Sequence, residues 1–278
     1  MLMDGHTHTE LCPHGSGEAT EKMIQRAIQL GMQKYCITEH APLPPEFKQQ
    51  YAGRLTGFTT ASLTLAMVPD YLKLARALQK KYASKLEISV GFEVDFLPDQ
   101  VAWTRAFLNE YGPQTQENIL SVHFMQGKDQ KFWCLDDTLT DFKAGFKAWL
   151  KQPQMLFNQY YQTVLASVLA DLGPTTPQRI GHMSLIRKFQ DRFNLTAPLD
   201  AINLALVDEI LDQIKWQNRE IDLNLAGLFK PFCNDFYPGN QILARAKKRD
   251  IPLIYGSDAH DIQSVGQGQH LATALING

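Results

Sequence analysis

Short apolar segments alternate with longer amphipathic segments over most of the chain. The apolar segments are predicted strands, and they lie at residues 2–5, 34–38, 87–96, 118–122, 179–181, 221–225 and 252–255. Several of the segments between them have the apolar spacing or the boundary residues of helices, at 18–30, 69–81, 98–110, 199–218 and 240–249, with a long helical stretch from about 140 to 171. Strands that alternate with helices in this way predict an α/β protein with a parallel sheet.

Polar side chains stand at or just beyond the end of each predicted strand. They are His6 and His8, Glu39 and His40, Glu93, His123, His182, Asn224 and Asp258. In a βα barrel the carboxyl ends of the strands form one rim, where active sites are built. We therefore predict a seven-stranded, TIM-like (β/α)7 barrel with its site on that rim. An open doubly wound sheet is the alternative, but the chain has neither G-x-G-x-x-G nor G-x-x-x-x-G-K-[ST].

The chain shows no internal repeat, low-complexity tract or linker-like stretch, so residues 1–278 are predicted to form one domain. Two long segments, at about 41–68 and 125–140, are predicted to be loops. Loops of this length inside a compact domain often carry function. We expect both to lie over the rim and to shape a pocket there.

The charge and composition of the chain exclude some partners. Lys and Arg number 27 and Asp and Glu 29, which gives a net charge of −2 and no electrostatic case for nucleic acid or a membrane surface. No apolar run has the roughly 18 residues of a transmembrane helix, and the first residues lack the pattern of a signal peptide. The four cysteines are widely spaced, as expected for reduced thiols in a cytoplasmic protein. No pattern specifies an oligomeric state.

Histidine is the commonest of the polar residues expected at the predicted rim. Of the eight histidines, seven belong to this pattern: His6, His8, His14, His40, His123, His182 and His260. The imidazoles of His6 and His8 share one face of a strand, because side chains alternate along it. Glu93 and Asp258 add carboxylates, which can bridge two divalent cations and offset their charge. So many ligands predict two or three metal ions.

Covalent catalysis by a side chain has no support in the sequence. The chain has no cysteine followed by arginine six residues later, no D-x-D-x-[TV], no R-H-G and no G-x-S-x-G. Water activated by bound metal ions is therefore the expected nucleophile.

Four motifs resemble those of the polymerase and histidinol phosphatase (PHP) superfamily. They are His6-Thr7-His8, Thr38-Glu39-His40, His123 and Ser257-Asp258-Ala259-His260. Within that superfamily, the segments 37–45, 91–95, 121–124 and 181–182 resemble the monofunctional histidinol-phosphatase branch. The resemblance covers nearly the whole chain. It implies a distorted (β/α)7 barrel of the PHP type with three divalent ions, and zinc, iron and manganese all suit such ligands.

The resemblance also implies ligand sets and a reaction. One ion would be held by His6, His8, Glu93 and Asp258, a second by Glu93, His123 and His182, and a third by His14, His40 and His260. Glu93, Asp258 and His260 are the implied catalytic residues. The implied enzyme is a phosphoric monoester hydrolase that converts L-histidinol phosphate to L-histidinol and phosphate, a late step of histidine biosynthesis.

Three further residues are candidates for binding the substrate. Lys230 and Arg187 are the candidate cations for the phosphate group. Asn224, at a predicted strand end, is a candidate for orienting either the substrate or a histidine ligand.

Other functions remain open. A PHP-type phosphoesterase could act on nucleotides or on other small phosphate monoesters. An amidohydrolase also begins with H-x-H, although its bridging ligand is typically a lysine, where this chain has Glu93. A non-catalytic metal-binding protein on the same scaffold would have lost ligands, and all nine are present here.

Overall fold

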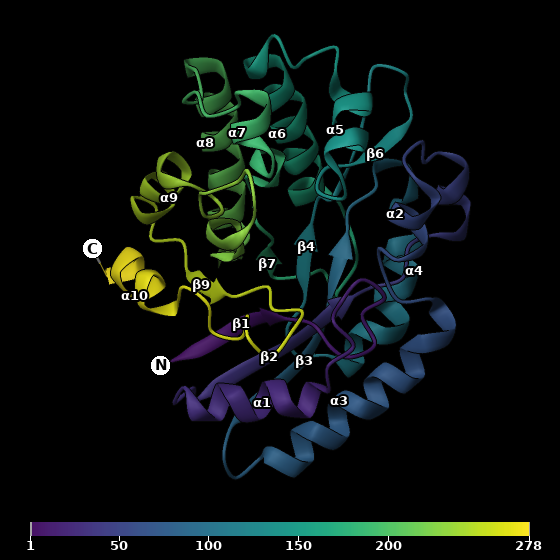
Figure 1. Cartoon of the computed structure of the whole chain (residues 1–278), viewed down its shortest axis with the longest axis vertical. Helices are drawn as coiled ribbons and strands as arrows, with labels where there is room; N and C mark the ends of the chain where they lie inside the picture. The colour runs from purple at the N-terminus through teal and green to yellow at the C-terminus, as the bar shows by residue number, and fades with distance from the viewer. Residues whose placement is uncertain (1, 278) are drawn as a thin grey trace.

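Seven parallel strands form the centre of the computed structural model, which describes residues 2–277 (Figure 1). Their order in the sheet follows the chain: β1 (Met3–Thr7), β2 (Lys34–His40), β3 (Glu87–Asp95), β4 (Ile119–Ser121), β7 (Arg179–Ile180), β8 (Glu220–Asn224) and β9 (Leu253–Gly256). The first and last strands also meet, because a hydrogen bond from His8 N to Ala259 O (2.9 Å) joins their ends. The sheet is therefore a nearly closed barrel, and the prediction of a (β/α)7 barrel is confirmed.

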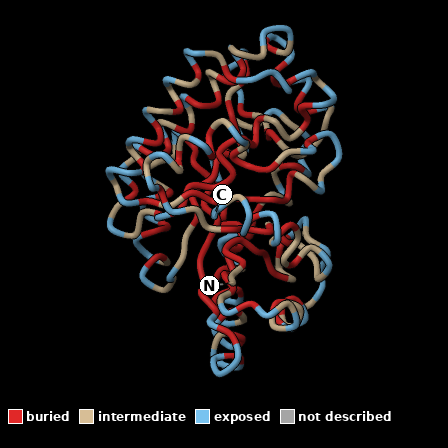
Figure 2. The backbone as a smooth tube through the Cα atoms, turned by 90° about the vertical axis from the view of Figure 1, so that its left-hand side faces the viewer, coloured by how far each residue is buried: buried red, intermediate tan, exposed pale blue. Residues whose placement is uncertain are grey.

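The barrel is irregular at two places. β7 contributes only two residues, and the pairing of β1 with β2 shifts in register between Asp4 and Thr7. The longer strands β2 and β3 are buried almost throughout, as expected for parallel strands covered by helices on one face and by packed side chains on the other. Figure 2 shows this buried centre in red within more exposed outer segments.

Helices cover the outside of the sheet. The longer ones are α1 (Thr20–Gln29), α3 (Val68–Tyr82), α4 (Val101–Tyr111), α5 (Leu139–Phe146), α6 (Pro153–Leu169), α8 (Ala201–Trp216), α9 (Asn240–Lys247) and α10 (Gln269–Asn277). Short ones are α7 (Gln190–Phe193), η3 (Pro98–Gln100), η4 (Gly112–Gln114), η5 (Leu185–Arg187) and η6 (Ala226–Phe229). Within residues 2–277, no helix is long and apolar enough to cross a membrane.

The helical prediction needs two corrections. The single stretch expected from about 140 to 171 is divided into α5 and α6, because Pro153 begins a new helix in the first turn, where its missing N–H is tolerated. The sequence pattern also gave no signal for α10.

The two segments expected to be loops contain regular structure. Residues 41–68 include η1 (Pro45–Gln49), α2 (Leu55–Thr59) and η2 (Leu65–Met67), and residues 124–134 form an antiparallel hairpin of β5 (Phe124–Gln126) and β6 (Phe132–Cys134). They pack together through an apolar cluster of Leu43, Phe47, Leu97, Phe124, Phe132 and Cys134. A hydrogen bond from Ala52 N to Phe132 O (2.9 Å) also joins them. Contacts between distant segments therefore order both beyond what local patterns predict.

A buried arginine links the strands at the amino end of the barrel. Arg179 of β7 is 2% exposed. Its guanidinium donates to the carbonyl of Gly5 in β1, to the carboxylate of Glu117 ahead of β4, and to Glu220 of β8 (Nε to Oε2, 3.4 Å). Because a charge at this depth is stable only when it is paired, these contacts favour one arrangement of the strands.

Replacing Arg179 with methionine should lower the free energy of unfolding by about 3 kcal/mol, because the buried groups that it binds lose their partner. Urea denaturation measures the change. Arg105→Met is a matched control, since Arg105 is 47% exposed and pairs with Asp171 at the surface. The control should change the free energy of unfolding by less than about 1 kcal/mol. Equal losses in both variants would contradict a special role for the buried arginine.

Candidate metal centre

β1 brings two imidazoles to the carboxyl end of the barrel. His6 and His8 flank Thr7 in the sequence, and both side chains are fully buried. Thr7 is held by β2, where its hydroxyl donates to Cys36 O (2.7 Å). The Nε2 atoms of His6 and His8 lie 3.2 and 3.6 Å from the same oxygen, Glu93 Oε2. The H-x-H spacing thus places two nitrogens beside one carboxylate.

The Glu93 carboxylate, at the end of β3, is the group on which the imidazoles converge. It is 1% exposed. Five imidazoles from the ends of β1, β2, β4 and β7 surround it: His6, His8, His40, His123 and His182. Among the shortest contacts are those of His182 Nε2 with Oε1 (2.9 Å) and of His40 Nδ1 with Oε2 (3.2 Å). The two carboxylate oxygens therefore face different imidazoles.

The segment after β9 adds Asp258 and His260. Asp258 Oδ1 lies 3.3 Å from His8 Nε2. The Asp258 backbone has a φ of 54°, which is uncommon for a residue with a side chain, although aspartate tolerates it better than most. A hydrogen bond from Asp258 N to His6 O (2.8 Å) holds this turn against β1. The last part of the barrel is thus fixed to the first.

His14 and His260 face each other with their Nε2 atoms 3.0 Å apart. Each ring has its Nδ1 beside a backbone carbonyl, which is Thr60 O for His14 (2.7 Å) and Asp258 O for His260 (2.9 Å). In the neutral rings both Nδ1 atoms therefore donate, and both Nε2 atoms are acceptors. Two acceptors at this distance repel each other unless a cation binds them.

The donor set fits divalent metal ions. Several buried ring nitrogens make no hydrogen bond within residues 2–277, although some lie near a Glu93 oxygen: Nε2 of His6, Nε2 of His8, both nitrogens of His40, and Nδ1 of His182. Buried polar atoms without partners are rare and need a cause. Three groups of possible ligand atoms lie within 4.8 Å of one another: His6, His8 and Glu93; Glu93, His123 and His182; and His8, Cys12, His40 and His260. Ligands at about 2.0–2.2 Å from one ion lie about 3 Å apart, so these spacings suit metal binding.

Carboxylates behind three of the imidazoles fix their orientation. The pairs are His6 with Asp222 (2.9 Å), His8 with Glu39 (3.1 Å) and His123 with Asp95 (2.9 Å), each through Nδ1. Such a partner sets the ring tautomer and leaves Nε2 free for a metal. The motifs do not reveal this role of the three carboxylates. A signal existed for Asp222, which alternates with Asn224 in β8 as His6 does with His8 in β1.

Burial and charge together set the protonation of the cluster. Burial opposes ionisation of Glu93, but the charges of His6 and His123 outweigh it and hold the pKa of Glu93 well below its usual range. Burial likewise opposes a charge on His8, but contacts with Asp258 and Glu39 raise its pKa to about 9. Without a metal the carboxylates are therefore ionised beside protonated imidazoles, and a divalent cation that binds here would replace those protons.

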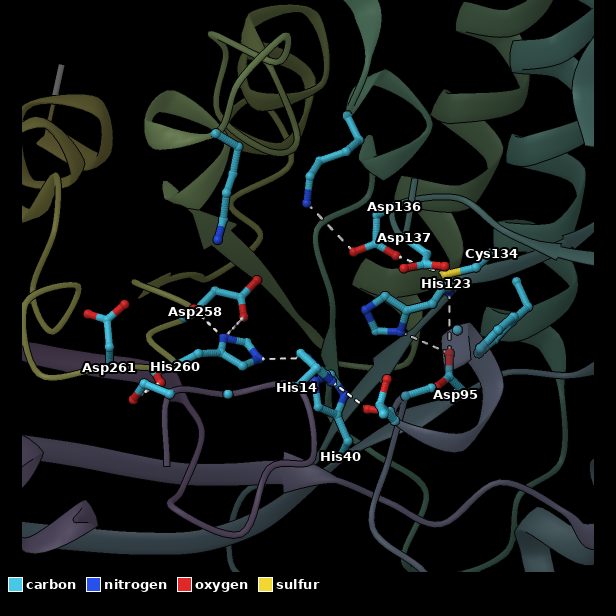
Figure 3. A pocket seen from close by; sticks show the side chains of 18 residues that line it. His14, His40, Asp95, His123, Cys134, Asp136, Asp137, Asp258, His260 and Asp261 are labelled. Atoms are coloured by element: carbon cyan, nitrogen blue, oxygen red, sulfur yellow. Dashed lines mark hydrogen bonds and ion pairs between the residues drawn. The ribbon is translucent and has the colours of Figure 1, made fainter. Parts of the chain in front are cut away.

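Cys12 lies in the third group of ligand atoms but differs from the imidazoles. Its side chain is buried, and burial raises the pKa of the thiol, with the Glu39 charge adding to the rise. The protonated thiol is a weaker metal ligand than the thiolate. His14 instead presents an acceptor nitrogen to His260, as Figure 3 shows. The geometry therefore favours His14 over Cys12 as a ligand.

A cavity of about 490 Å³ opens beside the centre (Figure 3). Five of the candidate metal ligands line it: His14, His40, His123, Asp258 and His260. The ordered rim segments supply other parts of the wall, including Thr60 from one and Asp136 from the other. The size is typical of a small-molecule site. A small molecule can therefore reach the donor set.

The three residues predicted to bind the substrate lie in different surroundings. Lys230 lines the cavity. Asn224 is fully buried, and its amide donates to Asp258 Oδ2 (3.1 Å) and Asp222 Oδ2 (3.2 Å), so it orients carboxylates. Arg187 does not line this cavity, because its guanidinium stacks on the Phe157 ring at 4.3 Å. The expectation that Arg187 meets a phosphate here is therefore corrected.

Lys188, rather than Arg187, is the cation that lies at the cavity after His182. It lines the cavity and pairs with Asp136 (Nζ to Oδ2, 3.7 Å). Its position directly after Arg187 was the available signal, since a short turn directs neighbouring side chains to different sides. Two lysines, Lys188 and Lys230, thus supply positive charge to the wall.

Fold and site together define a βα-barrel protein with a divalent-metal centre at the carboxyl ends of its strands. The chain belongs to the PHP domain family, whose model matches residues 4–226. This membership confirms the resemblance found in the motifs.

The chain is similar over its length to proteins named for one activity. It is 34% identical over 263 residues to the histidinol-phosphatase of Bacillus subtilis (strain 168), which covers 95% of each chain. It matches a solved structure described as a candidate histidinol phosphatase from Listeria monocytogenes with a TM-score of 0.94 and 41% identity, over 97% of this chain and 99% of that one.

A more distant solved structure shares the fold. It is the histidinol phosphate phosphatase of Lactococcus lactis subsp. lactis, complexed with zinc, L-histidinol and phosphate. The TM-score is 0.71 at 19% identity, over 99% of this chain and 93% of that one.

Asp222→Asn should weaken metal binding about 10- to 100-fold, because an amide oxygen is a poorer partner for the Nδ1–H of His6 than a carboxylate. Titration of the metal-free protein with Zn²⁺ measures the affinity. Asp212→Asn is the matched control, since Asp212 is 65% exposed and pairs with Arg249 on the outside. An Asp222→Asn affinity equal to that of the control would show that Asp222 does not support the centre.

Proposed function

We propose that the chain is a histidinol-phosphatase, which hydrolyses L-histidinol phosphate to L-histidinol and phosphate with divalent metal ions at the candidate centre. The observation that carries the proposal is the set of buried imidazole and carboxylate donors beside a cavity with two lysines on its wall. The similarity to the Bacillus subtilis and Listeria monocytogenes proteins supports this substrate.

Three ions are the number that the donors suit best. The proposed sets are His6, His8, Glu93 and Asp258; Glu93, His123 and His182; and His14, His40 and His260. A shared role for Glu93 is supported by its two oxygens, because Oε2 is near His6 while Oε1 is near His182. Zinc, iron and manganese all suit these ligands.

The chemistry divides between the ions and the chain. Bound divalent ions supply charge neutralisation at the phosphate and activation of the attacking water. Glu93, Asp258 and His260 would hold the divalent ions beside the phosphate. Asn224 keeps the Asp258 carboxylate oriented by donating a hydrogen bond to it. Lys230 would bind phosphate oxygens, which are strong acceptors for a cationic donor.

Acidic side chains on the cavity wall suit the cationic end of L-histidinol phosphate. Asp136 and Asp261 both line the cavity. Burial opposes ionisation of Asp136, but the charge of Lys188 lowers its pKa, so its carboxylate is ionised at neutral pH. Sugar phosphates lack an ammonium group that could meet these carboxylates. The wall therefore favours an amino-bearing phosphate monoester.

Metal-loaded protein should release phosphate from L-histidinol phosphate with a kcat/KM at least about a hundredfold above that for nucleotides and sugar phosphates, because a wall with paired charges rejects substrates that leave them unpaired. A phosphate-release assay over this panel measures the ratio. Glu93→Ala, which removes the shared carboxylate, should lose turnover and metal content together.

Three results would contradict parts of this proposal. Similar rates over the whole panel would indicate a less selective phosphoesterase. No release by protein with verified metal content would indicate a non-catalytic metal-binding protein. Near-normal turnover by Glu93→Ala would rule out the shared role of that carboxylate.

Lys230→Ala should raise the KM for L-histidinol phosphate about tenfold, because one charge-assisted hydrogen bond to the phosphate is lost. Steady-state kinetics with the metal-loaded protein measure the change. Lys85→Ala is the control, since Lys85 is exposed and lies outside the cavity. An unchanged KM in Lys230→Ala would remove this lysine from the phosphate site.

A further inference from the structure

A second cavity, of about 250 Å³, lies between α6, the segment 187–199 and the loop that joins β8 to α9. In Figure 1, α6 and α7 lie in the upper part of the molecule and α9 lies at the left, below them. Among the described residues, none lines both this cavity and the one beside the metal centre. Its wall combines a cation, a carboxylate and apolar side chains, so its chemistry differs from that of the first cavity.

Arg187 and Tyr161 form the donor end of this second cavity. A guanidinium has five N–H groups, and the contacts of Arg187 occupy three, toward Gln190 Oε1, Leu195 O and Ala197 O. The guanidinium also lies beside the Tyr161 hydroxyl, where burial raises the pKa of the hydroxyl and the Arg187 charge opposes the rise. At most two N–H groups are therefore left for a ligand. The Tyr161 side chain is fully buried, and within residues 2–277 its hydroxyl has no hydrogen-bond partner. Together these groups can bind a carboxylate through two or three hydrogen bonds.

The amino end of α9 adds to the same donor end. Gly239 is its N-cap, with a φ of 78° and no side chain to cap the first N–H groups. The partial positive charge of a helix amino end favours an anion there. Asn240 and Gln241, the first residues of α9, both line the cavity.

Asp235 gives the cavity a negative group. Its carboxylate lines the wall and receives a hydrogen bond from Phe236 N (2.9 Å). No ion pair within 4.0 Å joins it to Arg187 in the part of the chain that the structure describes. Burial raises the pKa of Asp235, with the charge of Arg187 opposing the rise, so a cationic partner would stabilise its ionised form.

We propose that this cavity binds an L-α-amino acid, with the carboxylate at Arg187 and Tyr161 and the ammonium at Asp235. A small anion such as phosphate fits less well, because the Asp235 carboxylate would repel it. Pro198, Leu199 and Ile242 offer apolar contacts to the side chain of the amino acid.

The two segments that build this cavity also reach the first one. Lys188, which lines the first cavity, directly follows Arg187, and Lys230 lies in the same loop as Asp235. A hydrogen bond from Gln190 Nε2 to Cys233 O joins the two segments. We expect an amino acid held between Arg187 and Asp235 to shift Lys188 and Lys230, and so to change the KM for L-histidinol phosphate.

Calorimetric titration of the metal-loaded protein with each of the twenty L-amino acids tests the site. At least one should bind saturably at millimolar concentration or below. The matching amine without the carboxylate and the matching acid without the ammonium should each bind at least about tenfold more weakly, because each loses a charge-assisted contact.

Substitutions distinguish this site from the metal centre, where an amino acid could also bind. Tyr161→Phe should weaken binding about tenfold, because one hydrogen bond to the ionised carboxylate is lost, and Asp235→Asn should weaken it by at least about tenfold. Tyr35→Phe is the matched control, because Tyr35 is fully buried with a hydroxyl that has no partner in residues 2–277 and does not line this cavity. The control should bind as the unmodified chain does.

Two outcomes would overturn the site: no binding by any of the twenty, or binding that Tyr161→Phe and Asp235→Asn leave unchanged. The kinetic effect rests on the proposed function, whereas the binding measurements do not. A saturating amino acid should change the KM in the unmodified chain and less so in Tyr161→Phe at the same concentration. Binding without any change in KM would keep the site and overturn the link between the cavities.

Discussion

The burial of one carboxylate, Glu93, is the constraint on which the rim of the barrel depends. Removing an ionised carboxylate from water costs several kcal/mol unless partners replace the water. Here the partners are imidazoles carried by the ends of four strands. A strand out of register would remove an imidazole from the buried carboxylate and so destabilise the fold. Arg179 imposes a similar condition at the opposite end of the barrel. The buried charges of Glu93 and Arg179, at opposite ends of the barrel, therefore favour one register of the strands. Apolar packing between the two ends stabilises the barrel in that register.

The sequence predicts those parts of the molecule that local patterns determine. The strands follow from apolar runs, and their convergence follows from the rule that parallel strands end on one rim, so the positions of His6, Glu93 and Asp258 could be anticipated together. The carboxylates behind the imidazoles were not anticipated, because the alternation of Asp222 with Asn224 places Asp222 on the same strand face without telling whether it supports a ligand or a strand. The choice between Arg187 and Lys188 depends on which way one short turn faces, and that is decided by the ring of Phe157.

The segments over the rim show how order arises without a local signal. Residues 41–68 have too many breaks for a long helix, and the hairpin of β5 and β6 is too short to be stable alone. Packed together around Phe47, they form a small core of their own. Part of the wall of the first cavity is built beside this core, which keeps Asp136 close to the candidate metal centre.

The contact between β1 and the turn after β9 limits when the barrel can close during synthesis of the chain. His6 and His8 are synthesised well before Asp258 and His260, and the hydrogen bond from Asp258 N to His6 O (2.8 Å) forms only when both segments are present. A nascent chain that stops before residue 258 therefore lacks two of the candidate ligands and the contact that closes the barrel.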